Sequence, residues 1–155
     1  MIVDENAVLT TGFTVDPASL LTELPPPWRT KALRMVDDLG PYTTALRDYL
    51  DGDLGALDAV PIVQTGNGFR RRAWQALRQV KAGSVISYRE LATRAGNPRA
   101  ARAAGSACAA NLVPLLVPCH RVVGSDGALN HYYYGLGHKR WLLEHEAALP
   151  QPRLF

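Results

Sequence analysis

The sequence predicts a mixed fold of the α/β (α+β) class, in which a short N-terminal part, residues 1–65, precedes a mostly helical C-terminal part, residues 66–155. The first observation is an apolar content of 47%, which is enough for a core, in a chain without a membrane-spanning run of roughly 18 to 20 apolar residues. The second is that clear helical periodicity begins only after residue 65. The third is charge. The chain has 4 basic and 10 acidic side chains up to Gly68, but 13 basic and 4 acidic from Phe69 onward.

The N-terminal part is weakly patterned. Residues 7–15 are consistent with a short hairpin that turns at Gly12, and the three prolines at 25–27 indicate a break in the chain. Helices are predicted from about Arg29 to Asp38 and from Tyr42 to Leu50. These signals favour a small α/β arrangement before residue 66.

Three helices are predicted at the start of the C-terminal part. Apolar residues at helical spacing indicate a helix over residues 69–80. The sequence of residues 87–90, SYRE, is a capping box that begins the next helix, and Gly96 is suited to end it. Asn97-Pro98 is typical of an N-cap followed by the first helical residue, so a further helix is expected over residues 99–109. The last two helices, with their tight turn, form a helix-turn-helix pattern.

The second helix of this pair has almost no bulky side chains. Residues 100–107 are small except for Arg102. Close packing in a protein core explains such a composition. A helix of small residues can also lie deep in a narrow DNA groove, where Arg102 would be the one side chain able to enter the base stack. The basic charge of the C-terminal part allows the same two interpretations, solvated surfaces or an acidic partner such as nucleic acid.

The remaining elements are predicted from short patterns. Residues 112–118 are apolar and contain two prolines, which favours a buried extended segment. Residues 121–123 predict a strand, and residues 124–127 a turn. A closing helix is expected from Gly137 to Ala148, with inward side chains at Trp141, Leu142 and Leu143.

The strongest chemical signal is the sequence of residues 118–123, PCHRVV. A thiolate is a nucleophile, and a base or a water relay at His120 could take the proton from Cys119. A small buried cysteine that only packs is the alternative. The other cysteine, Cys108, is eleven residues away, which indicates neither a disulfide framework nor a zinc site, so we expect no metal and no cofactor. A reducing cytoplasm suits a free thiol.

The chain from about Phe69 to Glu146 resembles the O6-alkylguanine-DNA alkyltransferases, also called methylated-DNA–protein-cysteine methyltransferases. The resemblance lies in FRRRAWQAL, SYRELATRAGNPRAARAAGSA, NLVPLLVPCHRVVGSDGAL and HKRWLLEHE. It implies a DNA repair enzyme that flips O6-alkylguanine out of the duplex and transfers the alkyl group irreversibly, once per molecule, to Cys119. It also implies a shortened ribonuclease-H-like domain over residues 1–65 and a winged helix-turn-helix-like domain over residues 66–155.

The resemblance further implies four catalytic residues. Cys119 would accept the alkyl group, and His120 would take the thiol proton through a water molecule. Glu146 would orient His120, and Asn111 would support the loop that leads into Cys119. Leu112 departs from the family pattern, because a proline usually follows Asn111.

Five residues are implied to contact DNA. Arg102 would fill the space left by the flipped guanine, and Tyr88 would press on the phosphate of the flipped nucleotide and help to rotate it. Phosphate or backbone contacts are expected from Arg89, Asn97 and Ser125. The implied partner is double-stranded DNA, bound through its minor groove, and a monomer would suffice for the chemistry.

The substrate pocket departs from the family pattern. Tyr132 matches a family tyrosine near the guanine, and Gly135 matches the second glycine of a glycine-rich loop. Tyr134, however, stands where the first glycine is expected, and Tyr133 replaces a small residue. Either the two unexpected tyrosines face solvent, or they remodel the pocket wall and make it narrower or suited to a different adduct.

Three other functions compete with alkyl transfer. A non-catalytic, alkyl-damage-sensing DNA-binding protein would keep the helix-turn-helix but replace the acceptor cysteine, whereas Cys119 and Glu146 are both present. A Cys–His hydrolase would need an oxyanion hole, and a purely regulatory DNA-binding protein would need a dimer interface or an effector domain. The sequence contains no motif for an oxyanion hole, a dimer interface or an effector domain, so it favours the transferase.

Overall fold

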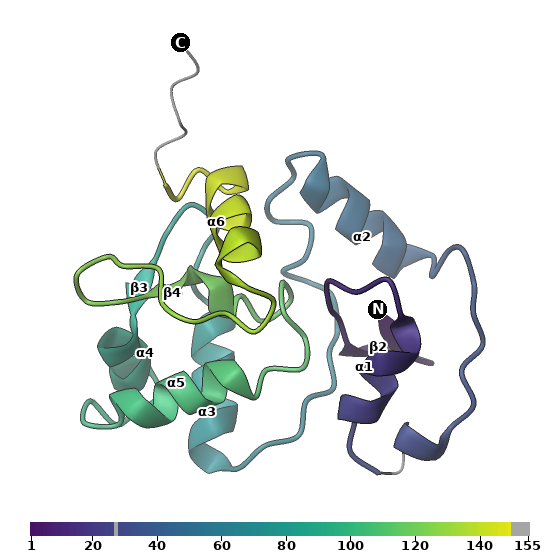
Figure 1. Cartoon of the computed structure of the whole chain (residues 1–155), viewed down its shortest axis with the longest axis horizontal. Helices are drawn as coiled ribbons and strands as arrows, with labels where there is room; N and C mark the ends of the chain where they lie inside the picture. Colours follow the sequence, from purple (N-terminus) through teal and green to yellow (C-terminus); the bar gives the residue numbers. More distant parts are fainter. Residues whose placement is uncertain (27, 150–155) are drawn as a thin grey trace. The chain divides into compact units, whose positions relative to one another are not determined.

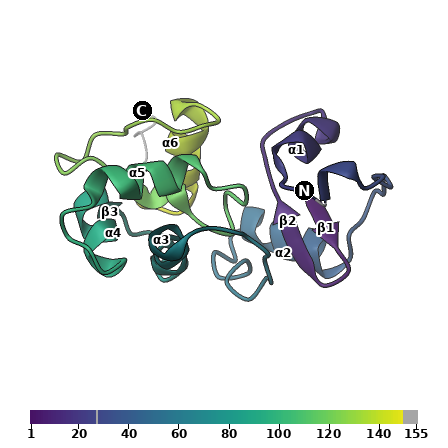
Figure 2. The same cartoon turned by 90° about the horizontal axis from the view of Figure 1, so that it is seen from below.

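The computed structural model describes residues 1–26 and 28–149, and the chain divides into two compact units (Figures 1 and 2). The N-terminal unit consists of residues 1–64 together with residues 112–116, and the C-terminal unit begins at Thr65 and contains the rest. No helix within the described ranges is long and apolar enough to cross a membrane. Both units combine helices with short strands, which confirms the α+β class.

The N-terminal unit contains a hairpin and two α-helices. Strands β1 (Ile2–Asp4) and β2 (Ala7–Thr10) pair antiparallel, and Val8 of β2 also forms an isolated parallel bridge to Ile62. Helix α1 (Pro17–Glu23) is followed by helix α2 (Pro41–Leu50). One core cluster of the unit is formed by Ile2, Leu9, Leu20 and Leu24, and the partly buried Leu21, Trp28, Leu33 and Leu112 pack against it. The ribonuclease-H-like arrangement of this unit stays a prediction.

The hairpin lies earlier in the chain than the sequence predicts. Its turn is at residues 5–6, not at Gly12, and the Asp4 carboxylate accepts a hydrogen bond from the Glu5 amide at 2.9 Å. All four residues of β2 are buried. A strand that is buried on both faces has no alternation of polar and apolar residues from which its register could be inferred.

The prediction of a helix from Arg29 to Asp38 is wrong, whereas the helix predicted from Tyr42 to Leu50 is confirmed. The chain forms one 3₁₀ turn, Trp28–Thr30, and is then irregular up to residue 40. Most side chains in that stretch are exposed, so a helix there would have no apolar face to bury. Helix α2 begins at Pro41, which suits the first helical position.

The C-terminal unit is built on three mutually packed helices (Figure 2). They are α3 (Gly68–Arg78), α4 (Tyr88–Arg94) and α5 (Ala101–Ala109). Strand β3 (Ile86–Ser87) pairs in parallel with β4 (Val122–Val123), and α6 (Leu136–His145) closes the unit.

The predicted signals of helix α4 are confirmed. The Ser87 side chain accepts a hydrogen bond from the Glu90 amide at 3.1 Å, as a capping residue does. Gly96 follows the helix with a φ of +86°, a left-handed conformation that glycine adopts without steric cost.

Helix α5 begins two residues later than predicted. The Asn97 side chain accepts a hydrogen bond from the Arg99 amide at 3.2 Å, and the Ala100 amide donates to the Asn97 carbonyl at 3.0 Å. Asn97 therefore closes a turn, and the helix starts only at Ala101. Helices α4 and α5 are the predicted pair. The winged helix-turn-helix description stays a prediction.

Two predictions in the C-terminal half of the chain are wrong in part. Residues 112–118 are mostly buried, as predicted, but they form bends and turns and not an extended segment, and Leu115 has a φ of +74°. Trp141 is 48% exposed and its ring stacks on His145 with centroids 5.2 Å apart. The buried face of α6 is set by Lys139, Leu142 and Leu143, whose spacing leaves Trp141 to one side.

Candidate active site

Cys119 begins a short 3₁₀ turn, Cys119–Arg121, that leads directly into β4. The Arg121 amide donates to the Pro118 carbonyl at 3.0 Å and closes this turn. Because a 3₁₀ helix has three residues per turn, neighbouring side chains leave it in different directions. Cys119, His120 and Arg121 are all buried in the C-terminal unit.

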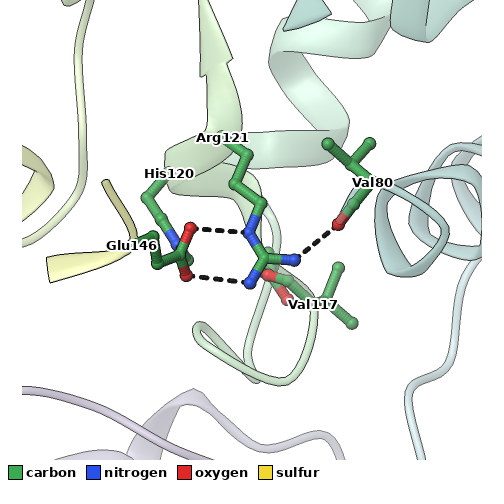
Figure 3. Close-up of polar contacts among 6 residues, drawn as sticks. Val80, Val117, His120, Arg121 and Glu146 are labelled. Atoms are coloured by element: carbon green, nitrogen blue, oxygen red, sulfur yellow. Dashed lines mark hydrogen bonds and ion pairs between the residues drawn. The ribbon is translucent and has the colours of Figure 1, made fainter. Parts of the chain in front are cut away.

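A buried carboxylate connects His120 with Arg121. Glu146, at the C-terminal end of α6, lies with its Oε1 atom 2.9 Å from His120 Nε2. Arg121 donates to the same carboxylate twice, from Nη2 to Oε1 at 2.8 Å and from Nε to Oε2 at 2.9 Å. Its Nη1 atom donates to the Val80 carbonyl, and Figure 3 shows the guanidinium between Glu146 and Val80. This two-point pairing fixes the orientation of the carboxylate.

The protonation states of this pair follow from burial and hydrogen bonding. Burial alone would raise the pKa of Glu146, but hydrogen bonds from His120 and Arg121 outweigh it and lower that pKa to about 2. Burial lowers the pKa of His120, against the opposing effect of Glu146, so the ring is neutral near pH 7. An ionised carboxylate can only accept, so His120 carries its proton on Nε2.

The other ring nitrogen of His120 is an acceptor. Nδ1 is buried and has no hydrogen-bond partner among the described residues. A buried nitrogen with a lone pair and no protein partner is a natural acceptor for a water molecule or for a substrate proton. The neutral ring, held by Glu146 on one side, can thus act as a base on the other.

Asn111 contacts the sulfur directly. Its Nδ2 atom lies 3.2 Å from Cys119 Sγ and donates to the Val117 carbonyl at 2.7 Å. Burial raises the pKa of the Cys119 thiol, whereas the Asn111 hydrogen bond and the positive charge of Lys139 oppose this rise. The interior therefore favours a thiol at rest and provides groups that stabilise the thiolate once the proton leaves.

Sequence reasoning assigned no role to Lys139 and Arg121, although both lie in the matched segments. The Lys139 side chain is fully buried, and its Nζ atom donates to the carbonyls of Val122 at 2.6 Å and Asn130 at 3.2 Å. Burial lowers its pKa. Its position on the same helical face as Leu142, Leu143 and Glu146 was the available signal, because a lysine on a buried face needs a specific partner.

Three of the predicted DNA-contacting residues lie together. Tyr88, Arg89 and Ser125 line one cavity of about 370 Å³, whose other lining residues are Ser87, Ala101, Gly124, Asp126 and Asn130. Burial raises the pKa of Tyr88 to about 12, so its phenol is neutral. Asn97 and Arg102 are exposed and do not line this cavity.

The predicted pocket tyrosines contact one another. The Tyr134 ring is close to both of the others, with centroids 6.1 Å from Tyr132 and 4.9 Å from Tyr133, the latter nearly perpendicular. Tyr133 is 73% exposed, while Tyr132 and Tyr134 are half-buried. Gly135 follows with a φ of +90° and is the residue that precedes α6. The effect of Tyr134 on the substrate stays a prediction.

The C-terminal unit thus belongs to the class of small helical domains in which a buried cysteine precedes a histidine that is paired with a buried glutamate. Residues 68–148 match the family model described as 6-O-methylguanine DNA methyltransferase, DNA binding domain. The chain belongs to the 6-O-methylguanine DNA methyltransferase family.

Similar curated proteins carry the name methylated-DNA–protein-cysteine methyltransferase. The protein from Salmonella typhimurium is 44% identical over 110 residues, which cover 71% of this chain and 64% of that protein. The human protein is 54% identical over 86 residues, which cover 56% of this chain and 42% of that protein. The matched part thus spans less than two thirds of these relatives.

Solved structures of this family share the fold. The O6-methylguanine methyltransferase of Mycobacterium tuberculosis superposes with a TM-score of 0.68 at 34% identity, covering 85% of this chain and 80% of that chain. The same organism's OGT in complex with DNA gives a TM-score of 0.69 at 36% identity, covering 79% and 74%.

Proposed function

We propose that this protein repairs alkylated DNA by transferring an alkyl group from O6 of guanine to its own Cys119. The observation that carries the proposal is the pairing of His120 with Glu146, because it leaves Nδ1 as a buried acceptor on the residue that follows Cys119 in the same 3₁₀ turn. The names of the similar proteins support the same reaction.

In the proposed reaction, the Cys119 thiol gives its proton through one water molecule to His120 Nδ1. The resulting imidazolium is stabilised by the ionised Glu146 carboxylate, and the thiolate by Asn111 and by the Lys139 charge. The thiolate attacks the alkyl carbon, so that a C–S bond forms while the C–O6 bond breaks. The electron pair of the broken C–O6 bond stays on guanine, which takes up one proton. A thioether has no hydrolysis route here, so each molecule reacts once.

Double-stranded DNA is the proposed partner, and the protein acts on it as a monomer. The alkyl carbon is unreachable inside a duplex, so the nucleotide must be flipped out, at a cost of about a few kcal/mol. Helix α5, whose exposed long side chain is Arg102, would lie in the minor groove, and Arg102 would fill the vacated space. The cavity lined by Tyr88, Arg89 and Ser125 would receive the backbone of the flipped nucleotide. Because the reaction needs a reduced thiol, we infer that it takes place in the cytoplasm.

Mass spectrometry of the intact protein tests this function. After incubation with duplex DNA that contains O6-methylguanine, we expect a gain of one methyl group, located on Cys119. The Cys119→Ser variant should bind the DNA but gain no methyl, whereas Cys108→Ala should react normally. Binding without mass gain by the wild-type protein would indicate a damage-sensing protein, and methyl release with repeated turnover would indicate a hydrolase.

A further inference from the structure

The loop of residues 112–116, which follows Asn111 and precedes the segment that leads into Cys119, belongs to the N-terminal unit. Residues 112–116 are part of that unit, while Asn111 before them and Val117 after them belong to the C-terminal unit. The Asn111 side chain bonds the Val117 carbonyl at 2.7 Å and closes the base of this loop. The same amide lies 3.2 Å from Cys119 Sγ, so the residue that precedes the loop contacts the reacting sulfur.

Two buried threonines of the N-terminal unit bind this loop. Thr10 Oγ1 donates to the Leu112 carbonyl at 2.7 Å, and the Thr11 amide donates to the same carbonyl at 3.0 Å. Thr11 Oγ1 donates to the Pro114 carbonyl. Thr10 is fully buried and Thr11 is 5% exposed, so these hydroxyls do not exchange freely with solvent.

The loop needs such external support because its own backbone provides little. It is irregular, its proline lacks an N–H group, and Leu115 has the left-handed φ of +74° that a branched side chain rarely adopts. Buried carbonyl groups require donors, and here the threonine hydroxyls supply them. The Leu112 side chain packs against the apolar core of the N-terminal unit and adds a second attachment.

We propose that Thr10 and Thr11 are positioning residues for alkyl transfer, which hold the loop of residues 112–116 so that Asn111 stays within hydrogen-bonding distance of Cys119. The inference rests on the proposed function of Cys119. Asn111 and Val117 are each joined to the loop by one peptide bond, so a loop that relaxes would move both ends. The amide would then lose its contact with Sγ, and the thiolate would lose a stabilising donor.

The experiment compares the double variant Thr10→Val/Thr11→Val with the wild-type protein. Valine keeps the shape and the backbone amides but removes both hydroxyls. Two properties are measured: the rate of methyl transfer from duplex DNA, and the pH dependence of Cys119 carbamidomethylation by iodoacetamide, with the modified peptide identified by mass. We expect methyl transfer to slow by about tenfold or more, because small displacements of reacting groups are costly. The apparent pKa of Cys119 should rise.

Controls separate positioning from general stability. Thr10→Ser/Thr11→Ser keeps both hydroxyls and should restore the wild-type pH profile, and Thr22→Val changes an exposed threonine of the same unit, on α1. Thermal unfolding verifies that each variant is folded. If the double valine variant does not fold, Thr11→Val alone, which keeps the Thr10 bond, is measured in its place.

The possible outcomes are distinct. An unchanged pH profile and transfer rate in a folded valine variant would overturn the proposal, as would serine variants that fail to restore the profile. If the wild-type protein transfers no methyl group, the proposed function fails, but the iodoacetamide profile still decides whether the threonines position Cys119.

Discussion

Glu146 Oε1 lies 2.9 Å from His120 Nε2, and both side chains are buried. The carboxylate also receives two hydrogen bonds from the buried guanidinium of Arg121. One carboxylate thus fixes the tautomer of the proposed base and neutralises a buried cation. Reactivity and stability consequently depend on the same side chain.

We expect Glu146→Gln to lower both stability and the rate of methyl transfer. Removing one partner of a buried ion pair leaves the Arg121 charge uncompensated, at a cost of about 3–5 kcal/mol in the free energy of unfolding. An amide in place of the carboxylate also fixes His120 less firmly and cannot stabilise the imidazolium, so transfer should slow by about a hundredfold or more. Urea unfolding and single-turnover kinetics measure the two effects.

Glu144→Gln is the matched control for that variant. Glu144 lies on the same helix and is 4.0 Å from Arg140, whose side chain is 62% exposed. An exposed pair of this kind contributes about 0–1 kcal/mol. Equal losses of stability in the two variants would contradict the importance of the Glu146 pairing.

Stability should decrease in acid over two ranges of pH. The pKa of His120 is lowered by burial from 6.5, so the unfolded chain binds this proton more readily, and stability falls as pH drops below about 6.5. The pKa of Glu146 is lowered from 4.5 to about 2 by His120 and Arg121, against the effect of burial. Its contribution is complete above about pH 4.5 and is lost between pH 4.5 and about 2.

Urea unfolding at a series of pH values measures both ranges. In His120→Gln, which has no titrating ring at this position, the decrease that begins near pH 6.5 should be smaller than in the wild-type protein. A wild-type unfolding free energy that stays constant between pH 6.5 and 4.5 would contradict the neutral state inferred for His120.

The sequence predicted what depends on local interactions. The capping box of Ser87 and the left-handed Gly96 act within one helix, so α4 could be located from its own residues. The motif around Cys119 is contiguous and could be recognised as a unit. The helix predicted from Arg29 was wrong because helix formation there depends on a buried face, which the tertiary structure does not provide.

The partners of the site residues could not be predicted in the same way. The role of Arg121 depends on Val80 and Glu146, which are far away in the sequence, and the role of Lys139 depends on the carbonyl groups of Val122 and Asn130. Backbone carbonyls carry no signal in a sequence. Such contacts arise only when the helices are packed, and they are therefore visible only in the structure.

The affinity for DNA should fall steeply as the salt concentration rises. The C-terminal part carries most of the basic side chains, and their contacts with phosphates release counterions.

Arg102→Ala should slow the repair of duplex DNA more than the repair of single-stranded DNA, because a single strand leaves no stacked space to fill. Transfer rates from both substrates measure this. Equal slowing on the two would argue against a wedge.

Tyr134 should restrict the size of the adduct that the pocket accepts. Its ring contacts the rings of both Tyr132 and Tyr133, and its carbonyl lies 2.7 Å from His138 Nδ1, so backbone and side chain are both held. A ring in a close-packed wall cannot easily yield to a bulky group. Stacking of the Tyr134 ring on an aromatic adduct would have the opposite effect and stabilise that adduct by about 0.5–1.5 kcal/mol. We therefore expect slow transfer from O6-benzylguanine relative to O6-methylguanine, and in Tyr134→Gly a rise in rate mainly on the benzyl substrate.

Tyr133→Ser, at a largely exposed position, is the control and should leave the ratio of the two rates nearly unchanged. If Tyr134→Gly also leaves that ratio unchanged, the ring does not contribute to the pocket wall.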